Sequence, residues 1–291
     1  MVPPNYHEFS LNDISLMYSY RPEDEVTVPV NVLIGLGVGL PVIQFIAFSL
    51  YRGNVSTTRK LWDIHAGLLS LTGAMSSQLM VTCILKNICG LPRPDLISRC
   101  QPDDQIAPIY ELSNIAICNG NQQFIDEGFR SFPSGHSSTI FCGMVITSLN
   151  ISGKLQVFDK RGISLKVLIS IVPLMIACFI ACTRISDNRH FLRDVIGGSI
   201  IGIYIGSWFY LQYFPSVLDL ENGGRAYPPR RLGVSKYLRE VGGFWKFKDE
   251  TGSFNERNLN CEEVWRKLDN PVPLIEFLDL DTNIKIFNDL V

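Results

Sequence analysis

Long apolar stretches without charged side chains limit what this chain can fold into more than any other feature of its sequence. Five of them lie at residues 28–51, 64–85, 137–151, 167–182 and 195–214. A helix of roughly 20 apolar residues crosses the hydrocarbon core of a bilayer, which is about 30 Å thick. Because such a series separated by polar loops is rare in soluble proteins, it predicts an all-α, multi-span transmembrane helical bundle. Buried helices of a large soluble core are the alternative.

The composition agrees with a membrane protein, since 46% of the residues are hydrophobic and only 19% are charged. A net charge of −2, without a basic patch rich in aromatic residues, predicts that nucleic acid is not a partner. The eight cysteines show no spacing typical of a zinc site, so we expect no metal centre. Gly198, Gly202 and Gly206 recur every four residues, and Gly35 and Gly39 repeat that spacing, which predicts that helices pack closely there in lipid.

Basic residues predict the orientation of the bundle. They gather after the first apolar stretch, after the third and beyond residue 214. By the positive-inside rule these segments are cytoplasmic, so residues 1–27 and the loops 86–136 and 184–193 face the lumen or the outside. We therefore expect a lumenal or extracellular segment 1–27, a membrane domain 28–214 that contains both loops, and a cytoplasmic tail 215–291. An outer N-terminus without a recognisable signal peptide also leads us to expect a missing upstream helix.

Three polar clusters lie on the predicted outer side, each beside a membrane boundary, at residues 86–95, 131–138 and 183–194. In the third cluster, a helix that begins near Asn188 would place His190 and Asp194 one turn apart on one face. The carboxylate would then accept the Nδ1–H of the imidazole and leave Nε2 free as a nucleophile. An interfacial histidine next to an unrelated capping aspartate is the alternative.

The other two clusters carry groups suited to an anion. Ser134 and Gly135 lie at a predicted helix start, where backbone N–H groups attract phosphate, and His136 can donate a proton to a departing alkoxide. Lys86 and Arg93 supply two cations. Taken singly, these clusters also fit an ordinary turn and a basic membrane boundary.

Together the clusters predict phosphoryl transfer. This reaction needs cations around the equatorial oxygens, an in-line nucleophile and an acid for the leaving oxygen. Lys86, Arg93 and Arg184 would supply the charge, His190 would attack phosphorus and His136 would protonate the leaving group.

The three clusters resemble the signature of a known family, the type 2 phosphatidic acid phosphatases. The matching residues are Lys86-(six)-Arg93-Pro94, then Pro133-Ser134-Gly135-His136, then Arg184-(five)-His190-(three)-Asp194. Residues 93–102 and 128–130 also look like the fungal branch, which contains diacylglycerol pyrophosphate phosphatase and lipid phosphate phosphatase. The resemblance covers roughly residues 10–214. Thr183 and Phe191 depart from it, since the family usually has Ser and often a second His there.

The resemblance implies an integral membrane enzyme, usually of six spans, in the endomembrane system (endoplasmic reticulum, Golgi or vacuole) or the plasma membrane. It would work without Mg²⁺ or another cofactor, with water and a phospholipid in the bilayer as its reactants. His190 would be the nucleophile, Asp194 would orient it and His136 would assist the leaving group. Phosphate binding falls to five positions: Lys86, Arg93, Ser134, Gly135 and Arg184.

The substrates that the resemblance implies are phosphatidate, lysophosphatidate and diacylglycerol pyrophosphate, cleaved through a phosphohistidine. A lipid phosphotransferase like the sphingolipid head-group synthases and a polyprenyl or sphingoid phosphate phosphatase are alternatives from the same superfamily. A transporter or scaffold that only holds anionic lipid is an alternative of another class. The sequence leaves the oligomeric state open. It also leaves open whether Cys100 and Cys118, both on the outer loop, form a disulfide or remain free thiols.

Overall fold

A computed structural model describes residues 3–51, 57–102, 111–219 and 223–227. These residues form helices and no β-sheet, so the all-α prediction is confirmed. The α-helices are α1 (Val30–Ile34), α2 (Leu40–Tyr51), α3 (Thr57–Cys89), α4 (Leu96–Cys100), α5 (Gln122–Gly128), α6 (Gly135–Leu155), α7 (Ser164–Ser186) and α8 (Leu192–Tyr213). A π-helical turn, Gly35–Gly39, joins α1 to α2, and Ile14–Leu16 and Ile115–Ile117 are short 3₁₀ turns.

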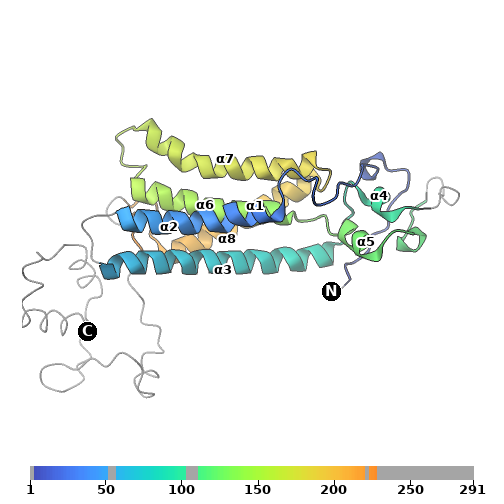
Figure 1. The fold of residues 1–291 in the computed structure, drawn as a ribbon, viewed down its shortest axis with the longest axis horizontal. Coiled ribbons are helices and arrows are strands. Elements are labelled where there is room, and N and C mark those ends of the chain that lie inside the picture. The colour runs from blue at the N-terminus through green and yellow to red at the C-terminus, as the bar shows by residue number, and fades with distance from the viewer. Residues whose placement is uncertain (1–2, 52–56, 103–110, 220–222, 228–291) are drawn as a thin grey trace, which may run out of the picture. The chain divides into compact units, whose positions relative to one another are not determined.

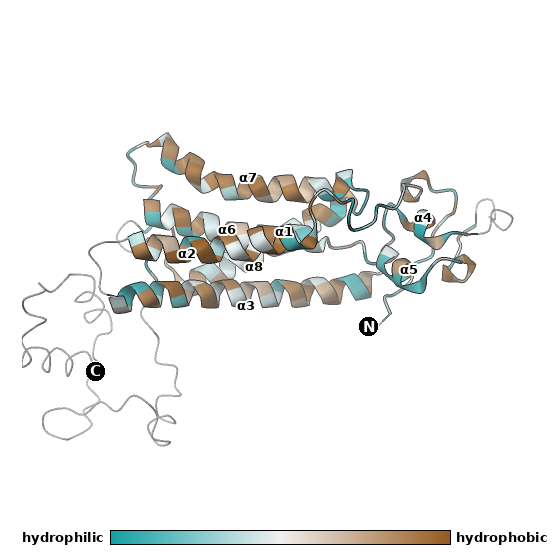
Figure 2. Cartoon of the chain, in the orientation of Figure 1, coloured by the Kyte–Doolittle hydropathy of each residue, from teal (hydrophilic) through white to brown (hydrophobic). Residues whose placement is uncertain are grey.

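Within the described residues, four helical segments are long and apolar enough to cross a membrane: Val30–Tyr51, Arg59–Cys89, Ser164–Ser186 and Leu192–Tyr213. Figure 2 shows apolar residues along the corresponding helices. The predicted fifth span, 137–151, is present as α6 but does not reach that hydropathy. The reason is its position, because α6 packs against both α7 and α8 and most of its side chains are buried. A helix that contacts other helices rather than lipid tolerates serine, threonine and asparagine.

The predicted close packing is confirmed for the glycines of α8 but is wrong for Gly35 and Gly39, since nothing lies within 4 Å of a Cβ built on either of these two. Glycines of α8 lie directly against the backbone of α6, as Cβ positions built on them show. A Cβ on Gly202 would lie 2.4 Å from the carbonyl oxygen of Ser138, and one on Gly206 would lie 2.8 Å from that of Cys142. Small residues therefore allow the two helices to approach to backbone contact.

The chain divides into two compact units, residues 1–45 with 67–225 and residues 46–66 with 226–291. In the first unit, α4, α5 and the N-terminal segment lie beyond one end of α6, α7 and α8 (Figure 1). In the second, the guanidinium of Arg59 donates to the carbonyl of Ala226 at 2.8 Å, and Asp63 accepts the N–H of Ala226. Residues 228–291 of the predicted tail lie outside the described residues.

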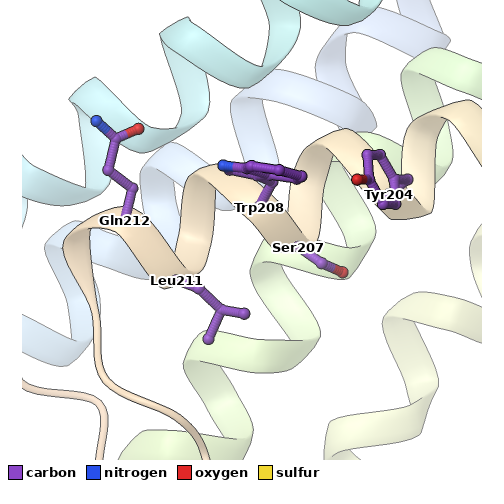
Figure 3. A pocket seen from close by; sticks show the side chains of 5 residues that line it. All are labelled: Tyr204, Ser207, Trp208, Leu211 and Gln212. Atoms are coloured by element: carbon purple, nitrogen blue, oxygen red, sulfur yellow. The ribbon is translucent and has the colours of Figure 1, made fainter.

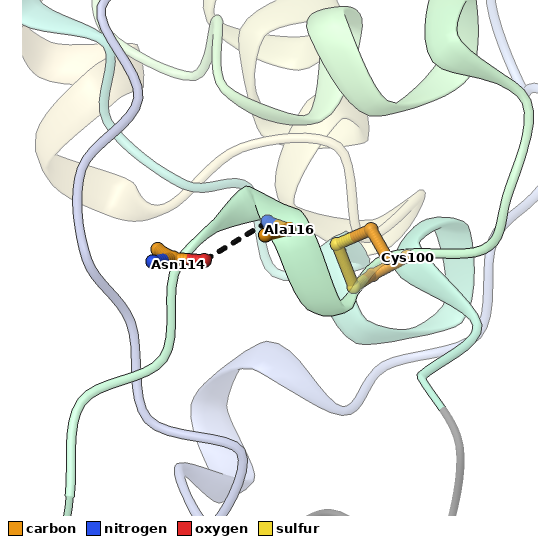
Figure 4. The surroundings of a disulfide bond; sticks show 4 residues. Cys100, Asn114 and Ala116 are labelled. Atoms are coloured by element: carbon orange, nitrogen blue, oxygen red, sulfur yellow. Dashed lines mark hydrogen bonds between the residues drawn. A yellow bond between two sulfur atoms is a disulfide. The ribbon is translucent and has the colours of Figure 1, made fainter.

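The segment 86–136, predicted only as a loop, contains α4, α5 and a small apolar core of its own. The core includes Phe9 and Leu16 of the N-terminal segment together with Leu96 and Phe129. A disulfide joins Cys100 at the end of α4 to Cys118, close to the 3₁₀ turn that the Asn114 side chain caps (Figure 4). This resolves the open choice between a disulfide and free thiols. The loop and the N-terminal segment thus form one packed structure.

Candidate active site

The first polar cluster continues from the end of α3. Lys86 lies in the last turn of that helix, and its Nζ donates to the carbonyl oxygen of Arg130 at 2.8 Å. Arg93 follows in the connection to α4, where its backbone N–H bonds to the carbonyl of Gly128 at 2.8 Å. The Nε of Arg93 is buried and bonds to none of the described residues. Lys86 and Arg93 therefore retain donors that an anion can use.

The second cluster forms the start of α6, as the sequence predicted. Ser134 is the N-cap, and its hydroxyl accepts the N–H of Ser137 at 3.4 Å. A Cβ on Gly135 would lie 3.7 Å from Cε of Lys86, so the first and second clusters are neighbours. His136 follows in the first turn with a buried Nε2 that bonds to none of the described residues. The free N–H groups of this first turn can bind phosphate.

The turn between α7 and α8 corrects one prediction. The helix that was expected to begin near Asn188 begins at Leu192, because Asn188 ends the preceding helix in a left-handed conformation with φ of 56°. The N–H of Asn188 bonds to the carbonyl of Ile185, and the N–H of Arg189 bonds to that of Arg184. This pair of bonds is a Schellman motif, in which asparagine can replace the usual glycine. His190 therefore lies on a turn rather than on a helix face.

His190 and Asp194 nevertheless come together. Nδ1 of the buried imidazole lies 3.8 Å from Oδ2 of the fully buried carboxylate, which is longer than a hydrogen bond. The same oxygen accepts the hydroxyl of Ser131 at 2.5 Å and the N–H of Phe191 at 3.0 Å. The carboxylate is thus held in place beside the ring by groups from two clusters. Sequence reasoning assigned no role to Ser131, whose only signal was its place three residues before Ser134.

Arg184, in the last turn of α7, bonds to a carboxylate, that of Asp187, which the sequence did not predict as part of the site. Its Nη2 donates to Oδ2 of Asp187 at 2.8 Å and to the carbonyl of Val28 at 3.1 Å. Asp187 is fully buried. The spacing of three residues within a helical turn was the signal in the sequence.

Electrostatics join the three clusters into one site. Burial, together with the positive charges of Arg184, Arg93 and Lys86, lowers the pKa of His136 to about 3, which brings groups from all three clusters to one ring. Burial, reinforced by the charges of Lys86 and Arg93, holds the pKa of His190 well below its usual value of 6.5, although Asp194 opposes the shift. Burial and the charge of Arg99 lower the pKa of Arg93 to about 10, so this guanidinium stays charged at neutral pH. His190 is therefore a neutral ring close to Lys86 and to the charged guanidinium of Arg93.

A cavity of about 300 Å³ is lined by Pro92, Phe191 and Arg193 among others, and Pro92 and Phe191 are the sequence neighbours of Arg93 and His190. Another hollow, of about 430 Å³, lies along α8 and is lined by Tyr204, Trp208 and Leu211 among others (Figure 3). It includes none of the predicted site residues. Among the described residues, no three His, Cys, Asp or Glu side chains are grouped so that they could hold a metal ion. Independence from metals remains a prediction.

Comparison with known proteins places every predicted site residue inside one matched region. A family model described as the PAP2 superfamily matches residues 67–217. The chain is 34% identical to lipid phosphate phosphatase 2 of Arabidopsis thaliana over 75% of this chain and 73% of the relative. It is 34% identical to a probable diacylglycerol pyrophosphate phosphatase 1 of Schizosaccharomyces pombe over 79% of each chain. For diacylglycerol pyrophosphate phosphatase 1 of Saccharomyces cerevisiae the identity is 28% over 74% of each. No solved structure matches the chain.

Proposed function

The chain belongs to the PAP2 superfamily, as its three motifs predicted, and from this premise we propose that it is a lipid phosphate phosphatase of the membrane. One observation carries the proposal. The neutral imidazole of His190 lies 3.8 Å from a buried carboxylate and close enough to Lys86 and Arg93 for their charges to lower its pKa. These groups lie at the ends of helices that are long and apolar enough to span a membrane, which is where the head group of a bilayer lipid lies.

In the proposed first step, Nε2 of His190 attacks phosphorus and the bond from phosphorus to the lipid oxygen breaks. Burial and the nearby cations lower the pKa of His136 to about 3, so His136 takes up a proton only when the negative phosphate lies beside it and offsets those charges. His136 then gives this proton to the lipid oxygen, so the dephosphorylated lipid leaves neutral at this position. Lys86, Arg93, Arg184 and the first turn of α6, with Ser134 and Gly135, stabilise the charge on the equatorial oxygens.

In the second step, His136 accepts a proton from water, and the water oxygen attacks phosphorus. The bond between phosphorus and Nε2 breaks, inorganic phosphate leaves and both histidines return to their starting states. Asp194 keeps Nδ1 of His190 directed toward its own carboxylate, and its negative charge balances the positive charge that the ring gains as a phosphohistidine.

Phosphatidate, lysophosphatidate and diacylglycerol pyrophosphate are the proposed substrates. The names of the relatives support them, and sphingoid and polyprenyl phosphates are alternatives. A phosphotransferase would use a lipid hydroxyl in place of water and would release no inorganic phosphate. We further propose that the site opens to the lumen of the endomembrane system or to the outside, with residues 1–27 on the same side and 215–291 in the cytoplasm.

Phosphate release in detergent micelles with a chelator present tests this function. The unsubstituted protein should release inorganic phosphate from at least one of the proposed substrates. His190→Ala should abolish release, because the variant lacks the proposed nucleophile. Asp194→Asn should retain weak activity, lowered by roughly 10²- to 10⁴-fold, since the nucleophile remains but loses its orienting charge.

His65→Ala is the matched control, because this exposed histidine lies far along α3 from Lys86 in sequence and contacts the ring of Trp62. It should leave activity unchanged. Full turnover by His190→Ala would rule out the phosphohistidine mechanism.

A further inference from the structure

The side chain of Asp187 is a buried carboxylate that accepts four hydrogen bonds. Oδ2 accepts Nη2 of Arg184 at 2.8 Å and the N–H of Thr27 at 3.1 Å. Oδ1 accepts the hydroxyl of Thr27 at 2.7 Å and Nη1 of Arg21 at 3.2 Å. Four donors from two distant parts of the chain therefore hold one carboxylate that has no exposed surface.

The N-terminal segment is fastened to this carboxylate over several residues. Besides Thr27 and Arg21, the carbonyl of Arg21 accepts Nη2 of Arg189 at 2.6 Å, and the carbonyl of Val28 accepts Nη2 of Arg184 at 3.1 Å. The segment is thus bonded both to Arg184 at the end of α7 and to Arg189, the residue before His190. Asp187 is the point at which the segment and the turn are joined.

These contacts leave one side of the Arg184 guanidinium available. Nη2 bonds to Asp187, Val28 and the hydroxyl of Thr183, and Nε also bonds to that hydroxyl. Among the described residues, none of the hydrogen bonds of Arg184 uses Nη1. A guanidinium is planar and rigid, so fixing Nη2 and Nε fixes the direction in which Nη1 points.

We propose that Asp187, clamped by Thr27 of the N-terminal segment, is a positioning residue that directs Arg184 at the phosphoryl group in the transition state. The proposal rests on the proposed function. If the carboxylate only added negative charge it would weaken the binding of an anion next to it. Its contribution is orientation, because a misdirected cation loses most of its interaction with the transition state.

The test uses orthovanadate, which takes the five-coordinate shape of phosphorus in the transition state, as a competitive inhibitor of phosphate release by the full chain. Asp187→Asn should weaken vanadate inhibition by roughly 10- to 100-fold, the range expected when a hydrogen bond to a charged group is lost. Thr27→Val keeps the side-chain shape but removes the hydroxyl donor, and it should weaken inhibition several-fold.

Two comparisons separate positioning from a general structural role. In an Arg184→Lys background, Asp187→Asn should have little further effect on vanadate inhibition, since the group it orients is gone. Asp126→Asn is the matched control, because Asp126 also holds the N-terminal segment, by accepting the hydroxyl of Tyr6 at 2.8 Å, and it is on α5 rather than beside Arg184. Vanadate should inhibit the Asp126→Asn variant as strongly as it inhibits the parent.

Unchanged vanadate inhibition in both Asp187→Asn and Thr27→Val would overturn the proposal. It would also be overturned if Asp187→Asn weakened inhibition as much in the Arg184→Lys background as in the parent, or if Asp126→Asn weakened inhibition as much as Asp187→Asn does. If Asp187→Asn does not fold, the result with Thr27→Val decides. A parent protein that releases phosphate through His190 while these variants behave normally refutes only the positioning role. A parent that releases no phosphate refutes the proposed function and the positioning role with it.

Discussion

At the scale of single residues, the site holds a neutral imidazole, that of His190, close to Lys86 and the charged Arg93. A histidine attacks phosphorus only as a neutral ring, and the burial of His190 together with the nearby Lys86 and Arg93 favours that state. The negative charge of the buried Asp194 acts to raise the pKa of His190, but the same carboxylate also accepts hydrogen bonds from Ser131 and Phe191. The ring thus lies beside a carboxylate without being kept protonated by it.

The lowered pKa of His190 predicts the pH dependence of the free enzyme. Since protonation removes the nucleophile and the pKa lies below 6.5, kcat/KM should start to fall only below that pH. Lys86→Gln removes a positive charge that lowers this pKa, so the acidic limb should move to higher pH while the rate also drops. Lys166→Gln, which breaks only an ion pair with Asp159 at the other end of α7, should leave the limb in place.

These limbs are measured from initial rates of phosphate release between about pH 4 and 8, a range that brackets the ordinary histidine value. An acidic limb above 6.5 in the parent, or one that Lys86→Gln does not move, would contradict the assignment of His190.

At the scale of elements, the site depends on how closely α8 approaches the start of α6. The carbonyl of Asp194 accepts the N–H of Ser134 at 2.9 Å, which ties the first turn of α8 to the start of α6. A Cβ on Gly198 would lie 2.4 Å from the carbonyl oxygen of Ser134. The glycine spacing therefore serves the site as well as the bundle, because it sets the distance between the second and third clusters.

The same approach predicts the effect of adding a methyl group. Gly202→Ala should destabilise the protein by about 1–3 kcal/mol, because its Cβ would meet the backbone of α6, which cannot move aside as a side chain can. Gly39→Ala should be neutral or slightly stabilising, since nothing lies within 4 Å of its added Cβ. Thermal unfolding in detergent measures both, and equal midpoints for the two variants would show that the helices are not packed this closely.

At the scale of the whole molecule, the N-terminal segment and the described part of the segment 86–136 fold into one structure. The N-terminal segment bonds to the segment 86–136 at several points, including Phe9 with Ser113 and Tyr18 with Pro94. The disulfide between Cys100 and Cys118 belongs to the same region, and such bonds persist in oxidising compartments. This agrees with the outer orientation that the basic residues of the other side predict.

A glycosylation test checks that orientation. Asn121→Thr creates an acceptor sequon at residues 119–121, and threonine can still cap α5 as Asn121 does. Expressed in a eukaryotic host, this variant should gain a glycan that endoglycosidase removes, because Asn119 is exposed on the predicted outer side. The double substitution Asp159→Asn with Arg161→Thr makes the matched sequon on the predicted cytoplasmic side and should stay unmodified. The reverse pattern would invert the topology.

The sequence by itself determined the helical membrane class, the family and the residues of the three clusters, because hydropathy and motif spacing are local properties of the chain. It also predicted the start of α6, since Ser134 is a local N-cap signal. The start of α8 was placed four residues too early, because whether Asn188 ends one helix or begins the next depends on the bonds that its neighbours make.

Only the tertiary structure decided which groups hold the site residues. The pairing of Ser131 with Asp194 joins residues 63 positions apart, and that of Thr27 with Asp187 joins residues 160 positions apart. The tertiary structure also showed that α6 is the central helix and can therefore be more polar than its neighbours. Such contacts arise from how helices pack and loops close over them, and no pattern within a single stretch of sequence records that packing.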